Sequence, residues 1–284
     1  YDRLIIPTEY EPDSPSPSTS IGWRDPRRRR GQLLWPERFG PGSITKIKVS
    51  LGTMGSAAQL QQRPSGVGGN IFSPIWWRFW KPKGSSLPPV SVRLADGTTH
   101  MAVTVEAPAV WSLVAQSWDA SFKDADSSSY VVGQVWSKSG GNYYLLDQVR
   151  DRFSFPETLT AIRQTTERHP LAKAKWIEEK ANGPAIIQTL KSEIAGIIPI
   201  NPRESKEARA HSISPFVESG NVYLPHPAIA PWVFDLIDEC ANFPASMYND
   251  QVDSLTQAIL RFESMKKKKT GGALKQASTK GWGF

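Results

Sequence analysis

The sequence predicts an α/β fold with a mixed sheet. Strand-like apolar runs come first along the chain, and strand-like and helix-like segments then alternate, an order that is typical of this class. Hydrophobic residues make up 39% of the 284 residues, which is enough for a packed core. A chain of this length can hold one sizeable domain with appendages, or two small domains.

Local patterns place the expected elements in order. Alternating apolar residues around Asp96-Gly97 predict a hairpin within residues 90–108. Residues 111–118, 130–136 and 142–149 read as three consecutive strands of an antiparallel meander. A helix should begin at Ser154 or Pro156, and a later helix should end at Gly196. The remaining expected elements are strands at 172–179 and 197–200, helices at 183–196, 205–220, 230–243 and 251–262, and an edge-like strand at 221–225.

The beginning of the chain reads differently. Residues 1–31 are rich in Pro, Ser and Arg and indicate a linker or irregular arm, followed by short helical pieces at 44–52 and 57–62. The aromatic-rich residues 71–84 predict a packed cluster between domains, with a base-stacking platform as the alternative. Because the chain opens at Tyr1 without a basic and apolar leader, we expect no signal peptide and a fragment of a longer protein.

Three acids stand at element ends. Asp119 and Glu178 each close a buried, strand-like run, and Asp250 opens an apolar-periodic helix. Carboxylates that share a site repel one another unless a hard cation lies between them, and Mg²⁺ and Mn²⁺ favour such oxygen ligands. Two such ions about 4 Å apart can promote phosphodiester cleavage. The pattern therefore predicts a metal-dependent nuclease, with ordinary surface or capping acids as the alternative.

Neighbouring acids leave some assignments open. Glu178 and Glu179 are adjacent on a strand and point to opposite faces, so only one of them can join Asp119. Asp250 and Asp253 are three residues apart on a helix, and either can reach the same site.

Composition excludes several classes of protein. There is no run of about 18 apolar residues, so no membrane span is expected. A single cysteine, Cys240, excludes an internal disulfide framework and fits a reducing compartment. No GxxxxGK[ST] motif occurs, so we expect no ATP hydrolysis from this chain. The four histidines lack ligand spacing, so no zinc site is expected.

The chain is basic. Lys and Arg outnumber Asp and Glu by 34 to 27, for a net charge of +7, and Arg27–Arg30 and Lys266–Lys269 concentrate the excess. Such a balance suits nucleic acid as a partner, because basic groups add affinity for phosphates that does not depend on base sequence. Solvated tails are the alternative.

Four blocks of the sequence closely resemble the nuclease domain of tailed-phage terminase large subunits. They are VVGQVWSKSGGNYYLLDQVRDRFSFPETLTAI, IEEKANGPAIIQTL, ESKEARAHSISPFVESGNVYLP and NFPASMYNDQVDSLTQAI, within residues 110–262. GQLLWPERF and AAQLQQRPSGVGGNIF are similar to the stretch that links the ATPase domain to the nuclease, which extends the resemblance to residues 21–262. The resemblance implies a ribonuclease H-like mixed sheet flanked by helices, and a role in cutting concatemeric viral DNA during genome packaging.

The resemblance also implies a ligand set for two Mg²⁺ or Mn²⁺ ions. Asp119 is the first ligand and is shared between the ions, and the hydrophobic-Glu pattern before KANG selects Glu178. The family usually has two consecutive acids at the third position, where this chain has Asn249-Asp250, so Asp250 is the third ligand and Asp253 the reserve. Asn249 then either caps the helix or offers a neutral oxygen.

Three basic residues are expected at the DNA. Lys123 follows the first acid, and Lys206 and Arg209 lie in SKEARA, where by resemblance they face the DNA backbone or the leaving phosphate. An ordinary solvated helix surface is the alternative for Lys206 and Arg209.

The resemblance divides the chain into three parts. We expect a linker or end of the ATPase-domain region at 1–75, the ribonuclease H-like nuclease at 76–262, and a basic flexible tail at 263–284. Implied partners are double-stranded DNA, the portal protein and the small terminase subunit, in the host cytoplasm, with the fragment monomeric alone and oligomeric on the portal. Alternatives are a catalytically weakened DNA-clamping module and a junction resolvase-like nuclease.

Overall fold

The computed structural model describes residues 4–12, 19, 21–62, 71–94, 97–120, 130–246 and 248–274. The chain divides into two compact units, Tyr1–Ile71 and Phe72–Phe284. Each unit is described by itself.

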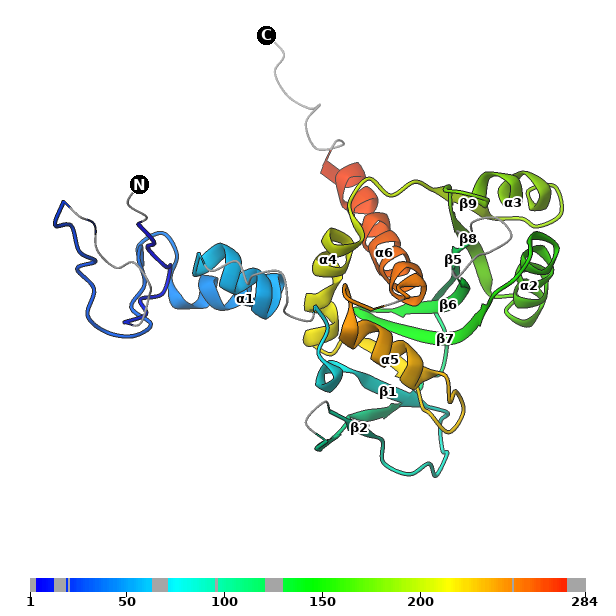
Figure 1. The fold of residues 1–284 in the computed structure, drawn as a ribbon, viewed down its shortest axis with the longest axis horizontal. Helices are drawn as coiled ribbons and strands as arrows, with labels where there is room; N and C mark the ends of the chain where they lie inside the picture. Colours follow the sequence, from blue (N-terminus) through cyan, green and yellow to red (C-terminus); the bar gives the residue numbers. More distant parts are fainter. Residues whose placement is uncertain are drawn as a thin grey trace, which may run out of the picture. The chain divides into compact units, whose positions relative to one another are not determined.

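The second unit is built on a mixed sheet with the strand order β4-β1-β10-β7-β6-β5-β8-β9 among the described residues (Figure 1). β5, β6 and β7 form the expected antiparallel meander, and β8 and β9 continue the sheet parallel to β5. The strands are β1 (Arg78–Lys81), β4 (Thr104–Glu106), β5 (Leu113–Asp119), β6 (Val131–Ser139), β7 (Asn142–Asp151), β8 (Ala172–Glu178), β9 (Ile197–Ile200) and β10 (Val222–Pro225). A mixed sheet flanked by helices confirms the predicted fold class.

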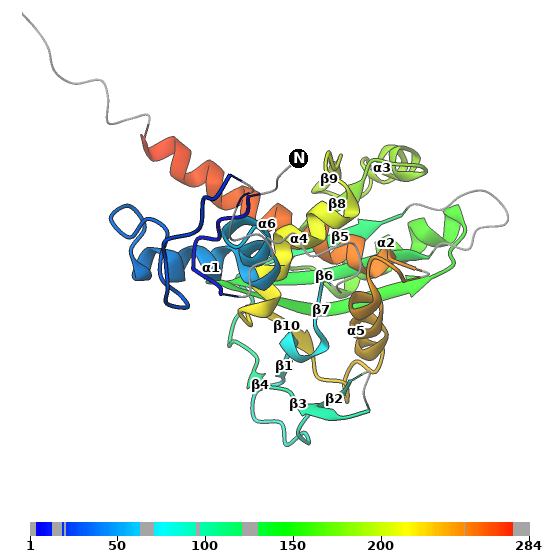
Figure 2. The ribbon, with the colours of Figure 1, turned by 60° about the vertical axis from the view of Figure 1, so that its left-hand side comes forward.

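Helices cover both faces of the sheet (Figures 1 and 2). One face carries α2 (Phe155–Arg168) and α3 (Gly183–Leu190). The other carries α4 (Lys206–Glu218), α5 (Val233–Asn242) and α6 (Asp250–Leu274), with α6 packed on β5 and β6. The expected hairpin is present as the antiparallel pair β2 (Ser91–Arg93) and β3 (Thr99–Met101), although Asp96 of its turn lies outside the described residues.

The two faces of the sheet differ in chemistry. On the α2 and α3 face, Trp118 and Ile177 are buried in an apolar cluster with Ile162 and Ile186. Gly133 makes room for this cluster, because a Cβ there would meet the Trp118 ring at 2.4 Å. Alternation along β5 turns Ser117 and Asp119 to the opposite face, beneath α6.

Hydrogen bonds fix α6 on the polar face. The Ser117 hydroxyl donates to the Ser254 carbonyl oxygen at 2.8 Å, and the Ser254 hydroxyl donates to the Ser117 carbonyl oxygen at 2.8 Å. The Gln257 side-chain amide donates to Ser117 Oγ at 3.0 Å and to the Trp176 carbonyl oxygen of β8 at 3.3 Å. These contacts set the first turn of α6 beside the ends of β5 and β8.

Several expected elements need correction. Helix α3 ends at Leu190 rather than at Gly196, and the residues between them form turns. Strand β10 is no edge strand, since it lies buried between β1 and β7 and is parallel to both. Helix α6 runs to Leu274, so the expected start of a flexible tail at residue 263 falls inside a helix.

The aromatic-rich segment packs as expected, but inside the sheet unit. Phe72, Trp77, Phe79 and Trp80 are buried, and β1 forms within the segment. The Trp80 indole N–H donates to the Leu145 carbonyl oxygen at 2.7 Å. Rings held in this way cannot serve as an open platform for bases.

The first unit contains α1 (Pro41–Gly55) and a π-helix over Ser56–Leu60. Arg27 fixes part of the segment that was expected to be an irregular arm. It is buried and donates to the Pro7 carbonyl oxygen at 2.8 Å and to Asp25 Oδ2 at 2.7 Å. The hydrogen bond from Arg27 lowers the pKa of Asp25. Arg27 therefore does not belong to a solvated basic run. In neither unit do the described residues include a helix both long and apolar enough to span a bilayer.

Candidate metal centre

Two of the predicted acids are neighbours across parallel strands. Asp119 ends β5 and Glu178 ends β8. Each acid directly follows a residue of the Trp118–Ile177 pair, which joins the two strands. Both side chains turn to the α6 face, and both residues are buried at 3% and 5% exposure. Glu179 is exposed, so Glu178 is the member of the pair that joins Asp119.

The backbone around Glu178 allows no added side chain at the start of α3. A Cβ on Gly183 would lie 1.9 Å from the Glu178 carbonyl oxygen, so only glycine permits this close return of the chain. The sequence pattern placed Gly183 only at the start of the helix expected at 183–196. The close approach it makes depends on the fold and could not be seen in the pattern.

The first turn of α6 brings the other two acids. Asp250 and Asp253 are buried, and the backbone N–H of Tyr130 donates to Asp250 Oδ2 at 3.2 Å. Glu239 of α5 stabilises this turn. Its Oε1 accepts hydrogen bonds from the backbone N–H groups of Gln251 at 2.8 Å and Val252 at 3.2 Å. Glu239 thus caps the helix that carries both acids.

Sequence reasoning missed Glu239 and its partners. The helical spacing of α5 was the available signal, because it places Glu239 three residues after the buried Leu236, and a buried acid needs hydrogen-bond partners. Arg150 lies 3.5 Å from Glu239 and stacks on the ring of Tyr130 at 4.0 Å, so the cap and the Asp250 contact share one network.

Helix α4 places two basic side chains on the acids. Arg209 is buried, donates from Nη2 to Asp253 Oδ1 at 2.8 Å, and holds Nη1 3.9 Å from Glu178 Oε2. Lys206 donates from Nζ to Asn249 Oδ1 at 2.6 Å and forms an ion pair with Asp253. The contacts made by both side chains are with site residues, whereas a DNA-facing role was expected. Lys123, Asp124 and Asp126 lie outside the described residues.

Electrostatics link all the acids of the group. Burial alone would lower the pKa of Lys206, but the negative charges of Asp253, Asp119 and Asp250 outweigh it and raise that pKa. Burial raises the pKa of Asp250 and of Asp253 despite the nearby positive charges, and Glu178 adds to the effect on Asp253. Lys206 therefore lies within electrostatic reach of Asp119, Asp250 and Asp253, and Asp253 lies within that of Glu178.

The donor chemistry of this group fits a hard divalent cation. Carboxylate and amide oxygens are the ligands that Mg²⁺ and Mn²⁺ favour. Within the described part of the chain, no three Asp, Glu, His or Cys side chains are already arranged around a common metal position. Lys206 and Arg209 lie among the carboxylates, so a bound ion would require some of these side chains to turn. The four acids and Asn249 are the groups that could hold it.

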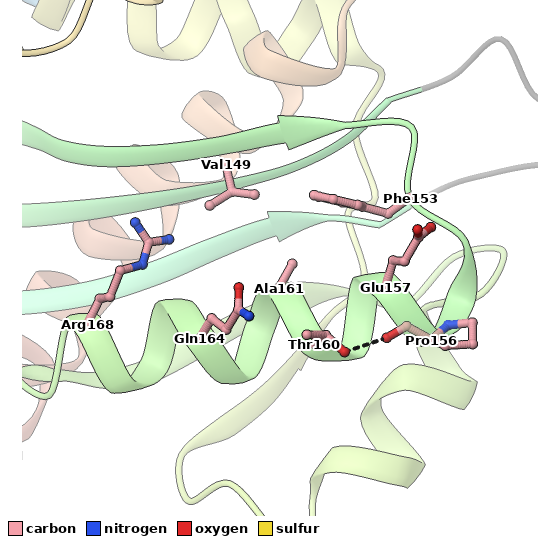
Figure 3. Close-up of a pocket in the computed structure, with 8 residues that line it drawn as sticks. All are labelled: Val149, Phe153, Pro156, Glu157, Thr160, Ala161, Gln164 and Arg168. Atoms are coloured by element: carbon pink, nitrogen blue, oxygen red, sulfur yellow. Dashed lines mark hydrogen bonds between the residues drawn. The ribbon is translucent and has the colours of Figure 1, made fainter.

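Hollows also occur outside this group. One of about 380 Å³ is formed between β7 and α2, with side chains from both elements pointing into it (Figure 3). Phe153 and Val149 give it an apolar wall, and Glu157 and Arg168 lie at its rim. The described residues that line it include none of the four acids, so it is not part of the candidate centre.

A mixed sheet whose neighbouring parallel strands end in acids, beneath a C-terminal helix that adds two more, defines a ribonuclease H-like domain. The family model of the terminase RNase H-like domain matches residues 116–262, just over half of the chain, and the chain belongs to this family. A search of functionally curated proteins by sequence gives no match.

The solved structures that match are distant in sequence. The large terminase nuclease from the thermophilic phage G20c is 15% identical with a TM-score of 0.44, over 66% of this chain and 96% of that chain. A form of that nuclease with bound magnesium is 14% identical with a TM-score of 0.42, over 66% and 95% of the two chains. The large terminase from a second thermophilic bacteriophage is 10% identical with a TM-score of 0.37, over 46% of this chain and 32% of that chain.

Proposed function

We propose that this chain is the nuclease portion of a phage terminase large subunit and cuts concatemeric double-stranded viral DNA with divalent metal ions. The convergence of Asp119, Glu178 and Asp250 at one end of the sheet, in a chain of the terminase RNase H-like family, carries the proposal. Mg²⁺ or Mn²⁺ is the metal that suits these oxygen ligands.

Each part of the site has a distinct task in this scheme. Asp119, Glu178 and Asp250 would hold the metal, which when bound would supply Lewis acidity toward water and the phosphate. Arg209 bridges Asp253 and Glu178 and fixes the inner wall of the site. The family resemblance suggests two ions, and the phosphate backbone rather than the bases would position the DNA.

The setting follows from the same proposal. Acting in genome packaging, the chain would meet the portal protein and the small terminase subunit in the host cytoplasm. The 1–75 region would connect it to an ATPase domain, and this chain alone would not hydrolyse ATP. A monomer is expected for the isolated fragment.

Nicking of supercoiled plasmid in Mn²⁺ tests the proposal. Asp119→Ala should abolish cutting but retain DNA binding in a gel-shift assay, because it removes a metal ligand and leaves the excess of Lys and Arg unchanged. Asp238→Ala removes an exposed acid on α5 and should cut like the wild type. Continued cutting by Asp119→Ala would contradict the assignment of this site.

A second candidate is a DNA-clamping module without catalysis. It is favoured by the basic groups that already neutralise Asp253, and by the neutral Asn249 beside Asp250. In that case the wild-type chain would bind plasmid and leave it uncut across the range of Mg²⁺ and Mn²⁺ concentrations.

A further inference from the structure

We infer that Arg152, held by Tyr248 beside Asp250, contacts a backbone phosphate of DNA close to the bond that is cut. The inference rests on the proposed function and adds to it a surface that meets the substrate. Lys206 and Arg209 were expected to face the DNA, but the contacts of both side chains are with residues of the site. Arg152 is a basic side chain that lies beside the same site and is exposed.

Arg152 belongs to a cluster with Tyr130 and Tyr248. The two tyrosine rings meet edge to face, with their centroids 5.0 Å apart. The guanidinium carbon of Arg152 lies 5.1 Å from the centroid of the Tyr130 ring, and its Nη2 donates to the Tyr248 hydroxyl at 3.2 Å. Two aromatic side chains therefore fix the direction of an arginine that is still open to solvent.

Backbone contacts attach this cluster to the acids. The backbone N–H of Tyr130 donates to Asp250 Oδ2 at 3.2 Å, and Tyr248 precedes Asp250 by two residues. Val131 pairs with Asp151 between β6 and β7, which brings Tyr130 and Arg152 together as the residues next to that pair. The cluster thus lies next to Asp250, one of the acids assigned to the metal.

The charge of Arg152 is the one in this cluster that has no acid paired with it. Arg150 stacks on the same Tyr130 ring at 4.0 Å, but its side chain is 22% exposed and lies 3.5 Å from the Glu239 carboxylate. The Arg152 side chain donates to Tyr248 and forms no ion pair with any acid in the described part of the chain. An anion bound to Arg152 would therefore offset a charge that the protein leaves uncompensated.

The chemistry of this arginine fits a phosphate. A guanidinium carries five N–H donors in a planar fork that matches the oxygens of a phosphate, and the Tyr248 hydroxyl accepts from one nitrogen of that fork. A side chain already held by two rings loses little conformational freedom when it binds. The DNA strand that the metal centre would cut presents such phosphates on either side of the scissile bond. Arg152 is thus a contact to the backbone and does not read the bases.

DNA binding measured without metal tests the inference separately from cutting. A labelled duplex is titrated in EDTA and followed by fluorescence anisotropy at several salt concentrations. Loss of one phosphate contact makes the slope of log K against log salt less steep by about 0.9, which corresponds to about eightfold weaker binding near 0.1 M salt. Arg152→Ala should show both changes. Arg163→Ala removes the same charge from α2, on the face of the sheet opposite α6, and should match the wild type (Figure 1).

Two milder variants test how Arg152 is held. Tyr248→Phe keeps the ring and removes the hydroxyl that accepts from Arg152. It should weaken binding less than Arg152→Ala and leave the salt slope unchanged, because the cation remains. Arg152→Lys should also keep the slope. Melting curves establish that each variant is folded, and if Arg152→Ala does not fold, an unchanged Kd in Tyr248→Phe overturns the inference.

Plasmid nicking in Mn²⁺ adds a second readout. A contact made equally in the bound substrate and in the transition state contributes to KM and not to kcat. Arg152→Ala should therefore raise KM for plasmid by about the factor by which it raises Kd, and leave kcat near the wild-type value. A purely structural loss at the site would instead lower kcat.

The outcomes separate this inference from the proposed function. A folded Arg152→Ala chain that matches Arg163→Ala in Kd and salt slope overturns the inference, and cutting by the wild type would leave the nuclease assignment standing. A wild-type chain whose DNA binding depends on Arg152 but which never cuts overturns the nuclease assignment and leaves the phosphate contact standing. A wild-type chain that neither binds nor cuts DNA overturns both.

Discussion

Replacing Glu239 with alanine should loosen the start of α6, the helix that carries Asp250 and Asp253. Glu239 is 7% exposed and accepts the Gln251 backbone N–H at 2.8 Å, the Val252 backbone N–H at 3.2 Å and the Gln251 side-chain amide at 2.7 Å. Losing a helix cap costs about 0.5–2 kcal/mol. Hydrogen bonds to a charged group contribute about 1.5–3 kcal/mol each.

The contributions of the cap and of the hydrogen bonds overlap. Burial of the Glu239 carboxylate, which raises its pKa above the ordinary value, offsets part of the stability that they provide. We therefore expect a net loss of about 3 kcal/mol, well below the sum of the separate bonds. For a unit of this size each kcal/mol shifts the melting temperature by about 2–4 °C, so Tm should fall by about 6–12 °C.

Thermal unfolding followed by circular dichroism without metal measures the change. Asp238→Ala is the matched control, because it removes the exposed acid next along α5, and its stability should stay within about 0.5 kcal/mol of the wild type. Glu239→Gln keeps an oxygen for the two backbone N–H groups and avoids burying a charge, so it should recover more than half of the loss. A Glu239→Ala chain that melts with the wild type would refute the capping role.

Two further substitutions test Gly183, which lies beside Glu178, and the Asp147–His169 pair, which lies elsewhere in the sheet unit. Gly183→Ala places a Cβ 1.9 Å from the Glu178 carbonyl oxygen and should destabilise the fold by about 1–3 kcal/mol and reduce cutting, whereas Gly141→Ala meets nothing within 4 Å and should leave both unchanged. Burial would raise the pKa of Asp147, but the hydrogen bond with His169 lowers it below its ordinary value. The stability that ionised Asp147 contributes is fully present above its unfolded pKa of about 3.9, and it is lost as the pH falls through its lower folded pKa. Asp147→Asn removes this contribution, so Tm should fall less steeply with decreasing pH than in the wild type. An equally steep fall would contradict the role of the pair.

Local patterning was sufficient for much of the sheet. The meander was predicted because each strand is a short apolar run bounded by turn residues, and this pattern depends only on neighbours in sequence. Asp119 and Glu178 were predicted to share a site because each closes such a run, and parallel pairing of β5 and β8 brings those ends together. The start of α6 at Asp250 was predicted for a similar reason.

Long-range packing decided what the sequence pattern could not. Residues 222–225 are a short apolar strand in any pattern, and only the contacts with β1 and β7 on its two sides place it inside the sheet. Lys206 and Arg209 were expected to face DNA, since periodicity does not reveal that α4 packs against α6. Their contacts with the acids depend on that packing.

Diffraction from crystals soaked in Mn²⁺, collected for anomalous scattering, tests the central claim most directly. We expect an anomalous peak bounded by carboxylate oxygens of Asp119, Glu178 and Asp250, next to the ammonium of Lys206. Ordered carboxylates at saturating Mn²⁺ with no peak among them, or side chains that point to separate faces of the sheet, would contradict the account.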